Sequence, residues 1–134
     1  MKLFECKDDV DLEDLKDLQP AMWVLFTSAL LYCKEHNILL VITSINSDRK
    51  NINSVSTTHE EGRAVDISTK GWPDLHINRL CYRLNRDHGD IAAISAKDLI
   101  PRAAIYHNSG YGAHIHLQVR PGVSLGKFIP ITRS

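Results

Sequence analysis

The stretch RAAIYHNSGYGAHIHLQV, residues 102–119, carries a clear pattern of two strands and a turn. Its two strand-like runs, RAAIYHN and AHIHLQV, flank the glycine-bearing segment 109–112, a pattern typical of a β-hairpin. Side chains alternate between the two faces of a strand, so His114 and His116 share one face of the predicted sheet. The isoleucine and leucine that follow each of them point to the other face, which we expect to be buried.

Four segments that precede this hairpin in the chain complete the prediction of an α+β domain. Pro20 opens a helix that reaches His36, with apolar side chains at helical spacing. The runs ILLVITSI (38–45) and RAVDIS (63–68) are short and apolar or alternating, as in strands. A second helix starts near Pro73, with Leu75, Leu80, Cys81 and Leu84 on its apolar face, and stops at Gly89. We expect a small, mostly antiparallel sheet with helices packed on one face.

Length and composition limit the possible functions. The 134 residues suit one domain over residues 1–134 with a core at about 20–120, and an apolar fraction of 43% suffices for that core. Sixteen basic residues balance sixteen acidic ones, which argues against nucleic acid as a partner. The three cysteines form no Cys-x-x-Cys pair, and Cys33 and Cys81 lie in apolar helical patterns, so we expect buried free thiols at those two positions. Neither a signal peptide nor a membrane span is predicted, which indicates synthesis in the cytosol.

A second stretch, HEEGRAVDI (59–67), supplies metal-binding side chains. Asp66 lies on a predicted strand, and His59 enters from the preceding loop, with Gly62 allowing a sharp bend between them. A His-x-His pair alone is more often packed or exposed than metal-binding. Together, however, His59, Asp66 and His116 provide imidazole and carboxylate ligands suited to Zn²⁺. Three protein ligands leave a fourth position for water, as in catalytic zinc sites.

These motifs resemble those of the D-alanyl-D-alanine carboxypeptidase-type zinc peptidases. The pattern His-x-x-Gly-Arg-Ala-x-Asp-Ile followed by His-x-His carries the resemblance, which covers roughly residues 20–120. Their superfamily also includes lysostaphin-type and murein endopeptidases and the hedgehog domain. The resemblance implies a hedgehog/peptidase-like fold, with zinc held by His59, Asp66 and His116. It also implies that His114 stabilises the oxyanion or moves a proton during hydrolysis of peptidoglycan stem peptides.

The chain departs from the family pattern at several positions. Many relatives place a carboxylate a few residues before the last zinc ligand, where this chain has Gly110, Tyr111, Gly112 and Ala113. A serine of the family is replaced by Thr57, and Arg49 is the nearest counterpart of an arginine that binds the substrate carboxylate. If the hairpin turn is centred on residues 110 and 111, His107 lies opposite His114. His107 could then act as the base or orient His114; an ordinary surface histidine is the alternative.

The expected function is therefore a zinc metallopeptidase that cleaves bacterial cell-wall peptides as a carboxypeptidase or endopeptidase. The alternative is a non-catalytic zinc-containing module of the same fold, either a binding module or a virion structural protein. Small versions of the domain without a leader resemble phage cell-wall enzymes, so release from the cell or association with a phage is expected. We interpret His36, His76 and His88 as helix-surface or helix-end residues.

Overall fold

A computed structural model of the protein describes residues 3–45, 62–94, 99–109 and 112–122. It has α+β architecture, as predicted. In chain order the elements are β1 Phe4–Cys6, the 3-10 helix η1 Leu12–Asp17, α1 Pro20–Glu35, β2 Leu40–Ser44, β3 Ala64–Ser68, α2 Asp74–Asp87, the 3-10 helix η2 Gly89–Ile91, β4 Ala93–Ile94, β5 Pro101–Arg102, β6 Ala104–Ser109 and β7 Gly112–Gln118.

Five strands form one mixed sheet in the order β1-β2-β3-β7-β6. β1 runs parallel to β2, and the other three pairings are antiparallel. Sequence patterning did not predict β1, because three residues are too few to show an alternation. The short strands β4 and β5 pair separately. The two predicted metal-binding strands, β3 and β7, are neighbours at the centre of the sheet.

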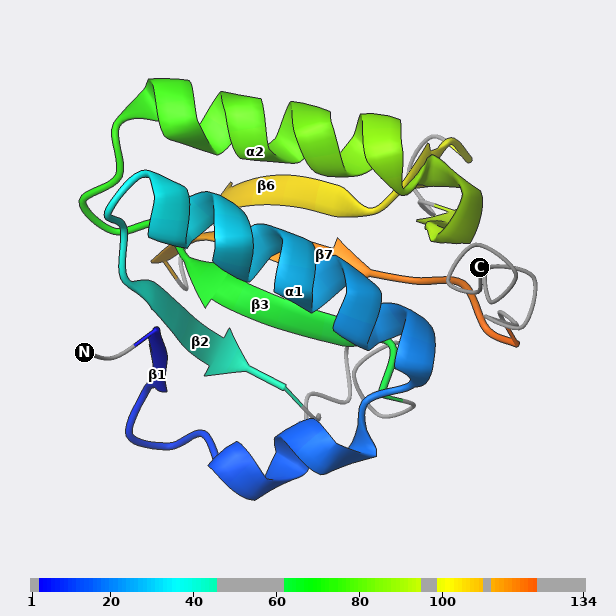
Figure 1. The fold of residues 1–134 in the computed structure, drawn as a ribbon, viewed down its shortest axis with the longest axis horizontal. Helices are drawn as coiled ribbons and strands as arrows, with labels where there is room; N and C mark the ends of the chain where they lie inside the picture. The colour runs from blue at the N-terminus through cyan, green and yellow to red at the C-terminus, as the bar shows by residue number, and fades with distance from the viewer. Residues whose placement is uncertain (1–2, 46–61, 95–98, 110–111, 123–134) are drawn as a thin grey trace, which may run out of the picture.

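Both α-helices lie on the same face of the sheet, the face that Figure 1 presents to the viewer. The hydrophobic core fills the space between these helices and the strands. Val65 and Ile67 of β3 and Ile115 and Leu117 of β7 point into it, and each has an exposed fraction of 0%. The alternating residues of β3 and β7 therefore point to the opposite face, away from the helices.

α1 confirms the predicted first helix to within one residue at its end. Pro20 occupies the first turn, where its missing N–H costs no hydrogen bond. Beyond the helix, Asn37 adopts a left-handed φ of 56°. The Ile38 N–H then donates to the Cys33 carbonyl at 2.8 Å, and the Asn37 N–H donates to Lys34 at 3.3 Å. This Schellman-type ending turns the chain directly into β2.

The second helix begins one residue after Pro73 and ends before Gly89, close to prediction, but its buried face is partly different. Leu80 and Leu84 are buried as expected. Leu75 was predicted to face the core, yet it is 53% exposed, and Ile77 is buried instead. The stripe Ile77, Leu80 and Leu84 fits a helical spacing of three and four residues, whereas Leu75 lies off that stripe.

Gly62 and Arg63 anchor the start of β3. Gly62 has a φ of 71°, and any Cβ there would overlap the backbone oxygen of Asp17. The buried Arg63 donates from Nη1 to the Val119 carbonyl at 2.8 Å, while the Val119 N–H donates to the Arg63 carbonyl at 3.0 Å. These bonds join the beginning of β3 to the end of β7. The left-handed φ of Gly62 agrees with the conformational freedom that the sequence predicted there, whereas the loop before it lies outside the described residues.

Candidate metal centre

Asp66 and His116 are direct cross-strand neighbours at the centre of the sheet. The register between β3 and β7 pairs Asp66 with His116 and Ser68 with His114. Because their flanking residues fill the core, these four side chains project from the face away from the helices. Two of the three predicted zinc ligands, separated by fifty residues in the chain, therefore lie side by side.

The side chains of these two predicted ligands are also in direct contact. His116 Nδ1 lies 2.8 Å from Asp66 Oδ1, and both side chains are mostly shielded, with exposed fractions of 14% and 17%. Two ligands of one tetrahedral zinc ion stand about 3.3 Å apart, given metal–ligand distances of about 2.0–2.1 Å. The observed 2.8 Å is shorter and is the length of a direct hydrogen bond, so the two atoms would have to separate by about half an ångström to share an ion. The residue types, imidazole and carboxylate, are those that zinc sites use.

Gln118 completes the surroundings of the His116 ring. Its Nε2 donates to the Arg102 carbonyl at 3.1 Å, which orients the amide so that its Oε1 faces His116 Nε2 at 3.0 Å. Both ring nitrogens of His116 therefore face oxygen atoms. A neutral imidazole carries a single N–H and can donate to only one of them. With Nε2–H donating to Gln118, Nδ1 contacts the Asp66 carboxylate either through a second ring proton or, if the two side chains separate, through a shared cation.

The ring of His114 is oriented by its own strand. Its Nδ1 lies 3.0 Å from the Gly112 carbonyl oxygen, which can only accept a hydrogen bond. Nδ1 therefore carries the proton, and Nε2 carries the lone pair in the neutral ring. A nitrogen in this state can accept a proton or bind a metal ion.

His107 lies directly opposite His114, as the hairpin register predicted. The centroids of their rings are 5.2 Å apart, and the His107 and His116 centroids are 6.2 Å apart. Three imidazoles from β6 and β7 thus form a row that ends at the Asp66 carboxylate. His107 is exposed, whereas His114 and His116 are partly covered.

Two predicted site residues, His59 and Arg49, lie outside the described residues. Within the described part of the chain, no group of three or more His, Cys, Asp or Glu side chains is arranged to hold a metal ion. The predicted ligand set His59, Asp66 and His116 therefore stays a prediction. Sequence reasoning missed Gln118, although its position two residues after His116 places it on the same face of β7.

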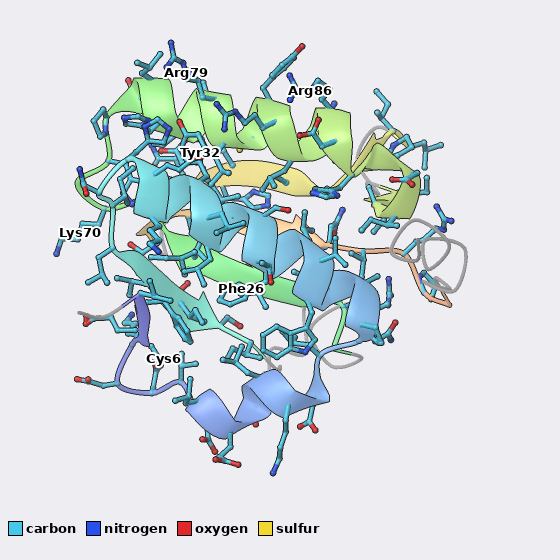
Figure 2. The ribbon with its side chains drawn as sticks, viewed as in Figure 1. Cys6, Phe26, Tyr32, Lys70, Arg79 and Arg86 are labelled. Carbon is cyan, nitrogen blue, oxygen red and sulfur yellow. The ribbon has the colours of Figure 1, made fainter. Side chains whose placement is uncertain are left out.

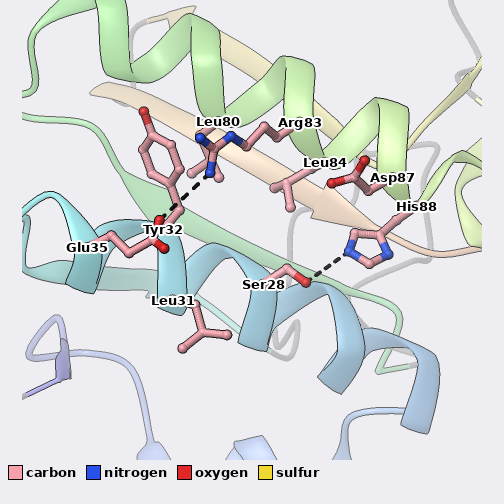
Figure 3. Close-up of a pocket in the computed structure, with 9 residues that line it drawn as sticks. All are labelled: Ser28, Leu31, Tyr32, Glu35, Leu80, Arg83, Leu84, Asp87 and His88. Atoms are coloured by element: carbon pink, nitrogen blue, oxygen red, sulfur yellow. Dashed lines mark hydrogen bonds and ion pairs between the residues drawn. The ribbon is translucent and has the colours of Figure 1, made fainter.

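A second group of polar side chains lies on the other face of the sheet, which the helices cover. A pocket of about 180 Å³ lies between α1 and α2, and its lining residues are drawn in Figure 3. In it, Ser28 Oγ lies 2.9 Å from His88 Nε2. Tyr32, which Figure 2 shows between the helices, places its hydroxyl 2.7 Å from His76 Nδ1. His76 and His88 were interpreted as ordinary helix residues. His76 does lie on α2 and His88 at its end, and each ring also has a side-chain partner on α1.

Comparison with family models, curated proteins and solved structures finds no match to this chain. Among the residues that the structure describes, no helix has the length and apolar character needed to cross a membrane.

Proposed function

We propose that the chain is a zinc metallopeptidase that hydrolyses peptide bonds in the stem peptides of bacterial cell wall. The observation that carries the proposal is the contact between His116 Nδ1 and Asp66 Oδ1, with Gln118 occupying the other ring nitrogen. This arrangement holds an imidazole nitrogen and a carboxylate oxygen side by side on one face of the sheet, as two ligands of one ion would be. His59 is proposed as the third protein ligand.

His114 is proposed to handle protons and developing charge beside this site. When bound, zinc would supply the Lewis acidity that activates a water molecule and polarises the scissile carbonyl. His114 Nε2 holds a lone pair because Nδ1 is engaged by the Gly112 carbonyl. It can therefore accept the proton of the attacking water and, once protonated, hydrogen-bond the oxyanion.

His107 is proposed to assist His114 as a second base or as a positioning residue. Its ring lies against that of His114, and its exposure allows exchange of protons with solvent. The described residues of β7 before His114 are Gly112 and Ala113, which offer no carboxylate for this role. An imidazole pair would then replace the acidic residue found in many members of the family that the motifs resemble. Arg49 is proposed to bind the substrate carboxylate.

Metal stoichiometry and hydrolysis, measured on the same protein, test the proposal. Purified wild-type chain should hold one tightly bound zinc and release product from peptidoglycan fragments. His116→Ala should lose both properties, whereas His36→Ala should keep both because His36 lies at the end of α1. Tight zinc binding without hydrolysis would support the alternative of a non-catalytic module. Absence of tight zinc in the folded wild-type protein would overturn the metallopeptidase proposal.

A further inference from the structure

We infer that His107 and His114 form a second transition-metal site, distinct from the proposed zinc site. The two residues are register partners on β6 and β7, so their side chains leave the sheet side by side. Two imidazoles bound to one tetrahedral ion have ring centroids about 5 Å apart, given metal–nitrogen distances of about 2.0–2.1 Å. The observed centroid separation of 5.2 Å is close to that value.

The orientation of His114 prepares it as a ligand. The Gly112 carbonyl accepts from Nδ1–H at 3.0 Å, which leaves the Nε2 lone pair for a metal ion. Histidine ligands in metal sites commonly donate their other ring N–H to a backbone carbonyl in this way. The contact fixes the tautomer before any ion arrives.

His116 belongs to the neighbouring site and does not complete this one. Its two nitrogens face Asp66 Oδ1 and Gln118 Oε1. The second ion would therefore have two protein ligands, His107 and His114, with water in its remaining positions. Two neutral imidazoles and water suit Zn²⁺, Ni²⁺ or Cu²⁺, and two ligands hold an ion more weakly than three.

A filled second site should inhibit the enzyme, an inference that rests on the proposed function. His114 Nε2 cannot hold a metal ion and accept a proton at the same time. Zinc would then activate the enzyme at low concentration and inhibit it at higher concentration. The site would thus couple hydrolysis to the free concentration of transition metal around the protein.

Calorimetric titration of the full chain with Zn²⁺ and with Ni²⁺ tests the second site without any measurement of activity. Wild type should bind one ion tightly and a second more weakly. Loss of a supporting contact alone lowers metal affinity about 10–100-fold. Because His107→Ala removes a ligand, it should lower the affinity for the second ion at least about tenfold. Asn108→Ala, a neighbour on β6 that points to the other face, should leave both ions unchanged.

The variant Asp66→Asn distinguishes the proposed zinc site from the second site, because it should lose the tightly bound ion and keep the weakly bound one. The inference is overturned if His107→Ala retains the second ion at wild-type affinity, or if Asp66→Asn removes both ions together. If the protein binds no zinc tightly but still binds an ion that His107→Ala abolishes, the second site is supported and the metallopeptidase proposal is refuted. Hydrolysis that persists when calorimetry shows the second site filled would overturn the inhibitory role.

Discussion

The His116 ring shows how much of the candidate centre depends on single side chains. Asp66 faces one of its nitrogens, and Gln118 faces the other. Gln118 is buried, with an exposed fraction of 6%, and the Arg102 carbonyl orients its amide. Gln118 thus orients the ring of a proposed ligand, the role that a supporting residue has in metal sites.

Gln118→Met should lower zinc affinity about 10–100-fold, since methionine keeps the length of the side chain but cannot accept the Nε2–H bond of His116. Chelator competition measures the affinity, and ¹⁵N chemical shifts of the His116 ring report its tautomer. Gln118→Glu retains an acceptor for His116 but loses the donor to the Arg102 carbonyl, so it should restore only part of the lost affinity. Wild-type zinc affinity in Gln118→Met would refute the positioning role, provided that the protein remains folded.

At the scale of elements, backbone contacts join the end of η1 and the start of α1 to the start of β3, the strand that carries Asp66. The Gln19 N–H at the start of α1 donates to the Gly62 carbonyl at 2.9 Å, just before β3. Gly62 combines a left-handed φ with a close approach to the backbone of Asp17. Only glycine satisfies both conditions, because a Cβ would strain the backbone and push the two segments apart.

Gly62→Ala should therefore lower the free energy of unfolding by more than about 2 kcal/mol, combining a conformational cost of about 1–2 kcal/mol with steric overlap. Denaturant unfolding measures the change. Gly71→Ala is the matched control, because Gly71 has a φ of 82° but no atom within 4 Å of an added Cβ. It should lose only the conformational part. Equal losses in the two variants would show that the contact with Asp17 is unimportant.

At the scale of the whole molecule, burial of thiols links stability to pH. Burial raises the pKa of Cys33 from its usual 9.0 to about 12, and that of Cys81 to about 11. Below pH 9 these thiols are protonated in both the folded and the unfolded chain. Between the unfolded and folded pKa values only the unfolded chain loses the proton. Their contribution to stability is therefore complete below pH 9 and falls as pH rises.

The free energy of unfolding should accordingly decrease above pH 9, by about 1 kcal/mol per pH unit for each buried thiol. Chemical denaturation at a series of pH values gives the slope. Cys33→Ala should flatten it, whatever its effect on stability at pH 7, whereas Cys6→Ala should change it less because Cys6 is only partly buried. A slope that is unchanged in Cys33→Ala would contradict this linkage.

Local chemistry in the sequence was sufficient to predict α1, β2, β3, α2 and the β6–β7 hairpin. It was also sufficient to predict which side chains of β3 and β7 share a face, because alternation along a strand depends only on the backbone. The position of His107 opposite His114 followed from the placement of the turn. The parallel strand β1 and the exposure of Leu75 did not follow, since both depend on contacts between distant segments.

Only the tertiary structure decided which strands are neighbours. The pairing of Asp66 with His116 requires β3 and β7 to lie together, and this depends on how the core packs beneath α1 and α2. The same packing places Gln118 and the Arg102 carbonyl around the ring. Residue types and local spacing predicted the ligands, whereas the long-range burial of apolar side chains determined their partners.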